Sequence, residues 1–260
     1  MNSLLFLGTG PGAPVPGRAC SSVLLRAGGA AVLVDAGEPC SLRLRDAGFP
    51  VAGLDAVLVT HGHADHTGGL PMLVQSAWLE GRSHPLPLYL PAELIGPLRA
   101  WLDAIYLPTS LVGFDLVCRA WESGCAVEVG RGLTVTPFPT THLAGLQQRI
   151  NPDDAQRFKV FGLDVQVGSQ RLVFPSDLGA PDDLAPVLDR PCDLLVCELS
   201  HYPPAVLFSF LQGKPVRRLV LNHLSGDLAG AEDEIAAEAR ACLPAIQEVL
   251  VPRDGDEVPF

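Results

Sequence analysis

Short apolar runs separated by glycine-rich turns dominate the beginning of the chain. Residues 3–7, 22–26 and 31–35 are such runs, and this spacing is typical of a β-meander. Residues 54–60 form another apolar run, of the length of a buried strand, and it leads directly into a cluster of histidines. The pattern therefore predicts a sheet whose last strand ends in polar, chemically active side chains.

Helical patterns alternate with strands further along the chain. Residues 69–80 and 92–105 predict helices, and Pro71 is tolerated because it falls in the first turn. The clearest helix is predicted at residues 232–243, where apolar side chains recur along one face. The remaining predicted strands lie at 86–90, 133–138, 160–167, 171–174, 194–197 and 218–221.

Two strand-rich halves with helices outside them predict an α/β fold, a four-layer α/β/β/α sandwich. No charged or serine-rich linker divides the sequence, so we expect residues 1–260 to form one domain. Ligand sites in such folds collect where loops converge at strand ends. The loops that follow the predicted strands are therefore the place to look for chemistry.

The composition is globular, with 48% hydrophobic and 18% charged residues. The net charge of −11 argues against an extended nucleic-acid partner, although a local cationic site can still bind phosphate. No apolar run approaches the ~20 residues of a membrane-spanning helix, and the first apolar run has no basic leader. We expect a cytoplasmic protein that has reduced cysteines and no membrane partner, and we leave a homodimer open.

The strongest chemical signal is the run at 61–66, which contains three of the seven histidines of the chain. His61 and His63 stand at i and i+2 after a predicted strand, so they project to the same side of an extended segment. The turn into the next helix brings Asp65 and His66 round from a second direction. Such an arrangement can serve two metal ions. Imidazole and carboxylate ligands suit zinc, with manganese or iron as alternatives.

Three further residues follow predicted strands and complete the set of ligands. His142 ends the segment Pro139-Thr140-Thr141-His142. Asp177 follows the hairpin that the strands at 160–167 and 171–174 are predicted to form, and His223 follows the strand at 218–221. Each of these positions alone is more typical of a hydrogen-bonded structural residue. Their combination at strand ends, in this order, favours a shared metal centre.

This order of motifs resembles the metallo-β-lactamase-fold superfamily, whose pattern is H-x-H-x-D-H followed by His, Asp and His. The resemblance implies one metal group of His61, His63 and His142, a second of Asp65, His66 and His223, and a bridging residue, Asp177. It also implies that Asp35 is the early aspartate that supports the histidine loop without binding metal.

The loops resemble one branch of this superfamily. The opening Leu7-Gly8-Thr9-Gly10, with Arg18 before a strand, is similar to ribonuclease Z and the small phosphodiesterases related to it. The segment at 197–204 resembles the cyclic-phosphate phosphodiesterases, in which a histidine after the penultimate strand is thought to assist catalysis. The bridging aspartate argues against a true β-lactamase, and the short chain after His223 argues against the glyoxalase II type.

Two departures from these relatives limit the transfer of a substrate. Only 34 residues separate His142 from Asp177, whereas bacterial short-form ribonuclease Z carries a long tRNA-gripping arm in this interval. The cyclic-phosphate phosphodiesterase of phosphonate breakdown has a cysteine-rich extra zinc site near its start. This site is missing here, since only Cys20 lies near the start of the chain. We therefore do not expect tRNA processing.

The resulting hypothesis is a dinuclear hydrolase in which a bridging hydroxide attacks a small or cyclic phosphodiester. Asp65 is expected either to accept a proton from the nucleophile or to orient the hydroxide. His201 is the expected general acid for the leaving oxygen, because imidazole titrates near neutral pH. Glu198 is expected to orient a ligand histidine. Arg18 is a candidate for binding substrate phosphate, and residues 143–157 are a candidate lid.

Two other functions remain open at this stage. Lactonases and thioesterases of the same fold attack a carbonyl with a similar metal centre. A cofactor-biosynthesis or metal-dependent binding protein would keep the fold without hydrolysing anything. The complete set of ligands favours an enzyme, and the histidine run itself does not distinguish between these substrates.

Overall fold

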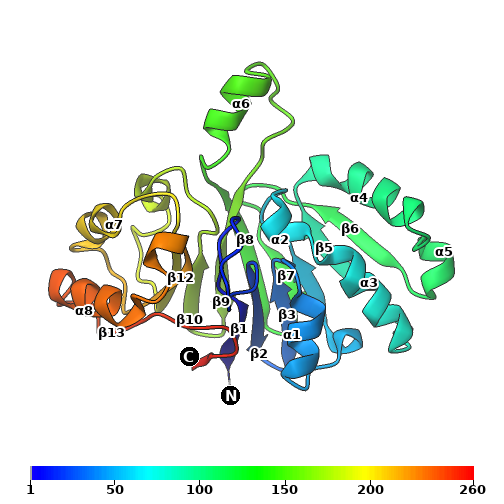
Figure 1. The fold of residues 1–260 in the computed structure, drawn as a ribbon, viewed down its shortest axis with the longest axis horizontal. Helices are drawn as coiled ribbons and strands as arrows, with labels where there is room; N and C mark the ends of the chain where they lie inside the picture. The colour runs from blue at the N-terminus through cyan, green and yellow to red at the C-terminus, as the bar shows by residue number, and fades with distance from the viewer. Residues whose placement is uncertain (1) are drawn as a thin grey trace.

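Two mixed seven-stranded sheets, described for residues 2–260 in a computed structural model, stack face to face with helices on both outer sides (Figure 1). The first sheet has the order β14 (Glu257–Pro259), β1 (Ser3–Gly8), β2 (Ser22–Ala27), β3 (Ala30–Val34), β4 (Ala56–Leu58), β5 (Leu86–Leu90) and β6 (Leu116–Ala120). The second has the order β13 (Glu248–Leu250), β12 (Arg218–Leu224), β11 (Leu194–Leu199), β10 (Gln170–Phe174), β9 (Phe161–Val167), β8 (Leu133–Pro139) and β7 (Val127–Gly130).

Each sheet combines an antiparallel part with a parallel part. The pairs from β14 to β3 are antiparallel and those from β3 to β6 are parallel. In the second sheet the pairs from β7 to β10 are antiparallel and those from β10 to β13 are parallel. The predicted meander and hairpin account for antiparallel parts, and the alternation of strands with helices accounts for the parallel parts.

Helices cover the outer face of each sheet. The first sheet carries α1 (Cys40–Asp46), α3 (Leu70–Leu79), α4 (Ala92–Ala104) and α5 (Thr109–Val112), and the short α2 (Ala64–Thr67) precedes α3. The second carries α7 (Pro204–Leu211) and α8 (Glu232–Cys242). Short 3₁₀ turns lie at η1 (Val51–Gly53), η2 (Pro181–Leu184) and η3 (Gly226–Leu228). The predicted four-layer sandwich is therefore confirmed.

Both faces of the central strands are buried, which explains why the sequences of strands such as β1 and β11 are continuous apolar runs. In β1, Leu4 and Phe6 face the core between the two sheets, whereas Leu5 and Leu7 pack under the helices of the first sheet. In β11, Leu194 belongs to the central core in the same way. Period-2 alternation thus positions three apolar layers around two sheets.

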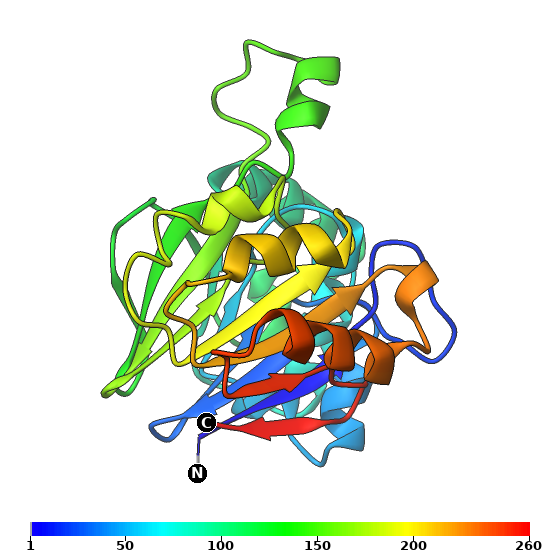
Figure 2. The same ribbon diagram turned by 90° about the vertical axis from the view of Figure 1, so that its left-hand side faces the viewer.

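The observed secondary structure differs from the prediction mainly at short strands. The predicted strand at 54–60 pairs only over β4, and β6, β7, β13 and β14 were not predicted. The segment after His142 contains α6 (Ala144–Ile150), which has no buried residue and projects beyond the ends of the sheets (Figures 1 and 2). Within the described residues, no helix combines the length and apolar character needed to cross a membrane.

Candidate metal centre

Three loops and the end of strand β12 bring the predicted ligands to one end of the sandwich. His61 and His63 follow β4, and α2 begins immediately after His63. Because α2 turns the chain at once, Asp65 and His66 face the same region and both are buried. His142 follows β8, Asp177 follows β10 and His223 lies in β12. The run at 61–66 therefore supplies ligands from two directions, as its pattern predicts.

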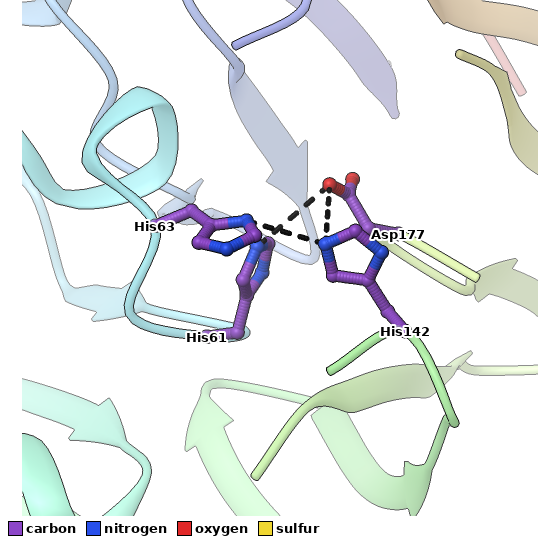
Figure 3. A group of neighbouring side chains, drawn as sticks. All are labelled: His61, His63, His142 and Asp177. Atoms are coloured by element: carbon purple, nitrogen blue, oxygen red, sulfur yellow. Dashed lines mark hydrogen bonds and ion pairs between the residues drawn. The ribbon is translucent and has the colours of Figure 1, made fainter. Parts of the chain in front are cut away.

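The first group consists of His61, His63, His142 and one oxygen of Asp177 (Figure 3). The Nε2 atoms of His61 and His142 lie 3.7 and 3.6 Å from Asp177 Oδ2. His142 Nε2 also lies 3.2 Å from His63 Nδ1. Zinc–nitrogen bonds of about 2.0–2.1 Å place neighbouring tetrahedral ligand atoms roughly 3.3 Å apart. These spacings fit ligand atoms arranged around one ion.

The second group consists of Asp65, His66, His223 and the other oxygen of Asp177. Asp177 Oδ1 lies 3.4 Å from His66 Nε2 and 3.5 Å from His223 Nε2. The same two imidazole nitrogens lie 3.4 and 3.7 Å from Asp65 Oδ2. Asp177 therefore presents one carboxylate oxygen to each group.

The electrostatics of the groups also fit a divalent cation. The buried Nε2 atoms of His61 and His66 have no hydrogen-bond partner among the described residues. Burial lowers the pKa of His61 well below its ordinary value and that of His142 to about 4, which keeps both imidazoles neutral. Burial also opposes a charge on His66, but Asp177 and Asp35 raise its pKa well above the ordinary value. The aspartate carboxylates thus favour a positive charge at the centre of the site.

Hydrogen bonds behind the ligands fix which imidazole nitrogen faces the centre. Asp35 Oδ2 accepts a bond of 2.8 Å from His66 Nδ1, and its carboxylate also accepts the Thr60 backbone N–H at 2.8 Å. Thr60 Oγ1 lies 3.2 Å from His61 Nδ1, and Ser21 Oγ lies 3.3 Å from His223 Nδ1. Such contacts orient metal-binding histidines and select their tautomer.

Backbone irregularity occurs at three positions around the centre. Asp35, Ser176 and His223 have φ angles of 57°, 58° and 50°, which non-glycine residues seldom adopt. The pairing of β11 with β12 shifts register after Asn222, so that Leu199 pairs with Leu224. His223 is thus the extra residue of a bulge, and such irregularities re-aim a side chain near functional sites.

His201 lies beside the first group without joining it. Its Nε2 is 3.9 Å from Asp177 Oδ2, and its side chain is 33% exposed, so solvent reaches it. Glu198 Oε1 lies 2.9 Å from His201 Nδ1 and also accepts the Leu178 N–H, while Oε2 accepts the N–H groups of Ser200 and His201. Glu198 therefore orients His201, which belongs to neither ligand group. The sequence had predicted that Glu198 orients one of the ligand histidines.

Arg18 is placed differently from its predicted role. Its guanidinium forms a buried ion pair with Glu232 and donates a bond of 2.6 Å to Thr9 Oγ1. Asp254 holds the same loop, since it accepts the backbone N–H groups of Thr9 and Ala19. Both terminal nitrogens of Arg18 thus hold the loop in place, and neither is free to bind a substrate phosphate as predicted.

A solvent-open cavity of about 300 Å³ lies over the ligands. Its floor contains His63, Asp65, Asp177 and His223, and His201 forms part of one side. The rest of the wall consists of Pro11, Gly12, Ala13, Ser200, Ser225 and Gly226. These rim residues were not predicted, and their only signal in the sequence is the glycine- and proline-rich first loop.

The chain resembles known proteins over most of its length. Residues 31–224 match the family model described as β-lactamase superfamily domain. Ribonuclease Z of Pseudomonas putida (strain GB-1) is 30% identical over 275 residues, which cover 85% of this chain and 84% of that protein.

Solved structures extend the likeness in fold to the whole chain. The metallo-β-lactamase fold protein YhfI from Bacillus subtilis has a TM-score of 0.78 at 22% identity, with 99% of this chain and 98% of that one covered. A diphosphatase from the PhnP family has a TM-score of 0.71 at 20% identity, with 100% and 98% covered. Together with the His/Asp groups, the matches show that this chain belongs to the β-lactamase superfamily, as a metal-dependent hydrolase of its ribonuclease Z-like branch.

Proposed function

We propose that the protein is a dinuclear metal-dependent phosphodiesterase that acts on a small or cyclic phosphodiester. The observation that carries this proposal is the position of Asp177, whose two carboxylate oxygens face two separate sets of three candidate ligands. The names of two similar proteins, a ribonuclease and a diphosphatase, denote cleavage at phosphorus. This supports phosphorus over a carbonyl carbon as the reacting centre.

The ligand set suits two divalent ions, for which we favour zinc over manganese or iron. Imidazole nitrogens and carboxylate oxygens are the usual zinc donors, and no thiolate belongs to either group. Two such ions supply Lewis acidity for a phosphoryl oxygen and lower the pKa of a nucleophilic water. His61, His63 and His142 would hold one ion, Asp65, His66 and His223 the other, and Asp177 both.

Two side chains that line the cavity are our candidates for proton transfer. Asp65 lies on the cavity floor, where its carboxylate is available to accept the proton of the attacking water. His201 presents Nε2 to the cavity while Glu198 holds Nδ1. Partial burial lowers the pKa of His201, but the hydrogen bond and charge of Glu198 outweigh it and raise the pKa. A protonated His201 near neutral pH suits donation to the leaving oxygen.

The size of the cavity supports a small substrate. Its volume of about 300 Å³ lies at the lower end for small-molecule sites. The relationship to a ribonuclease makes RNA a substrate that must be tested directly. We therefore propose a small phosphodiester as the substrate and keep structured RNA as the alternative.

The test combines metal analysis with a substrate panel. The purified protein, loaded with zinc or manganese, is assayed on bis-p-nitrophenyl phosphate, a nucleoside 2′,3′-cyclic phosphate, a tRNA precursor, a lactone and a thioester. We expect two ions per chain and hydrolysis of the first two substrates. A chain that hydrolyses only the carbonyl substrates, or only the RNA, refutes the proposal.

Leaving-group dependence tests the role of His201. Because p-nitrophenolate leaves without a proton, His201→Ala should lower kcat on bis-p-nitrophenyl phosphate only slightly. It should lower kcat on the cyclic phosphate about 10²-fold or more, since an alkoxide leaving group needs an acid. His84→Ala is the matched control, because His84 is exposed and outside both groups. Equal losses on both substrates would contradict an acid role.

A further inference from the structure

The wall of the cavity above the metal ligands is electrically neutral apart from His201. Apart from the four ligand residues and His201, it is lined by small or apolar residues, namely Pro11, Gly12, Ala13, Ser200, Ser225 and Gly226. None of these lining residues is a lysine or arginine. A second anionic group on the non-reacting substituent of the substrate would therefore lie against neutral walls. Burying a charge without a partner is unfavourable.

The rim also lies close to the ligands. A Cβ atom added at Gly12 would lie 3.4 Å from Oδ2 of Asp65, so that even a methyl group would contact the ligand carboxylate. A Cβ atom added at Gly226 would lie 3.7 Å from a methyl group of Val15. The loop after β1 and the η3 segment therefore meet above the second ligand group. Because these two segments lie close together, a substrate can enter between them only if their side chains are small.

The loop after β1, which forms part of this rim, is held in place by contacts within the protein itself. Asp254 accepts hydrogen bonds from the backbone N–H groups of Thr9 and Ala19, at 2.9 and 2.6 Å. The pair of Arg18 with Glu232 fastens the loop from the same side and keeps the one arginine of this loop away from the cavity wall. The loop thus has a preset shape, and its charge is neutralised internally.

We propose that this site selects phosphodiesters whose non-reacting substituent is compact and uncharged, and that Gly12, Ala13 and Gly226 determine this specificity. The inference rests on the proposed phosphodiesterase function and adds the class of substrate to it. Substrates that carry a second phosphate on the non-reacting substituent are discriminated against, because no lysine or arginine lines the wall and His201 is engaged with the leaving oxygen.

The experiment uses two esters that differ by one phosphate. Water attacks the 5′-phosphorus of both thymidine 5′-(p-nitrophenyl phosphate) and its 3′-phosphorylated form, and the bond to p-nitrophenolate breaks with release of a proton. The other product is thymidine 5′-phosphate from the first ester and thymidine 3′,5′-bisphosphate from the second. We expect kcat/KM of the zinc-loaded protein to be at least tenfold higher for the ester without the 3′-phosphate, with the difference mainly in KM. Equal values, or a preference for the 3′-phosphate, overturn the inference while leaving the phosphodiesterase function intact.

Substitution at the rim tests the assigned residues. Ala13 is exposed, so Ala13→Arg can place a cation at the wall without disturbing the core. It should raise the relative kcat/KM of the 3′-phosphorylated ester at least fivefold, whereas Ala13→Met, of similar length and no charge, should not change the ratio. An unchanged ratio in Ala13→Arg refutes the role of Ala13.

The size of the entrance is tested separately. Gly12→Leu should raise KM for the thymidine ester more than for methyl p-nitrophenyl phosphate, and Gly12→Ala should have a small effect on both. An equal effect of Gly12→Leu on both esters contradicts a size-selective rim. Failure of the protein to hydrolyse any phosphodiester refutes the proposed function itself, and this inference with it.

Discussion

Arg18 offers a direct test of whether a loop arginine binds substrate or fastens the loop. Its guanidinium and the carboxylate of Glu232 form an ion pair in which the side chains are 7% and 8% exposed. Removing one partner of a buried pair costs about 3–5 kcal/mol. Glu232 retains the Gly230 N–H at 3.1 Å and the exposed Arg253 at 3.3 Å. We therefore expect Arg18→Leu to lower the free energy of unfolding by about 2 kcal/mol, below the range for an isolated pair.

The pH dependence of this loss has a defined sign. Burial raises the pKa of Glu232, but its own backbone N–H, that of Gly230 and Arg18 outweigh burial and lower the pKa from 4.5 to about 2. A lowered pKa in the folded state contributes stability that is fully present above pH 4.5 and is lost as the pH falls through about 2. The difference between wild type and Arg18→Leu should therefore shrink as the pH is lowered across this window.

Urea unfolding of both proteins at several pH values measures the effect. Arg26→Leu is the matched control, because Arg26 pairs with Glu257 on the surface, where the side chains are 38% and 47% exposed. Such pairs contribute about 0–1 kcal/mol. If Arg18→Leu keeps the stability of the wild type and instead raises KM for a phosphodiester tenfold, the structural role is wrong and Arg18 is a substrate ligand after all.

Three further changes test the metal centre. Asp177→Asn should reduce the bound metal from two ions to one or none in elemental analysis, while Asp189→Asn, at an exposed position, should retain both. Asp35→Asn should weaken metal affinity about 10–100-fold in competition with a chelator, because it loses the carboxylate behind His66; unchanged affinity would contradict that role. Removal of metal by a chelator should lower Tm, since ligand at 1,000 times Kd stabilises by about 4 kcal/mol; an unchanged Tm would mean that the metals do not stabilise the fold.

The candidate metal ligands were predictable because each is close in sequence to the end of a recognisable strand. His61 comes three residues after β4, and Asp177 three residues after β10. The loops are short, so the position of the strand nearly determines the position of the side chain. The same reasoning placed the four layers, because strands with both faces buried have apolar sequences. Residue identity and local order were therefore sufficient for this part of the molecule.

Contacts between distant segments could not be predicted in this way. Glu232 is 214 residues from Arg18 in the sequence, and no local pattern indicates that they meet. Glu198 and His201 are only three residues apart, yet the direction of the Glu198 carboxylate depends on the turn that also presents the Ser200 N–H. The short strand β14 was missed for a related reason, since only its pairing with β1 makes it a strand.

The cavity rim shows why substrate is harder to infer than reaction chemistry. A ligand such as Asp65 acts through its own side chain, so its residue type reports its role. Gly12 acts through the side chain that it lacks, because a side chain at this position would begin in van der Waals contact with the Asp65 carboxylate. Glycine has many other uses in a loop, and its identity alone therefore does not point to specificity. Specificity at this site becomes visible only when the distance from Gly12 to Asp65 is known.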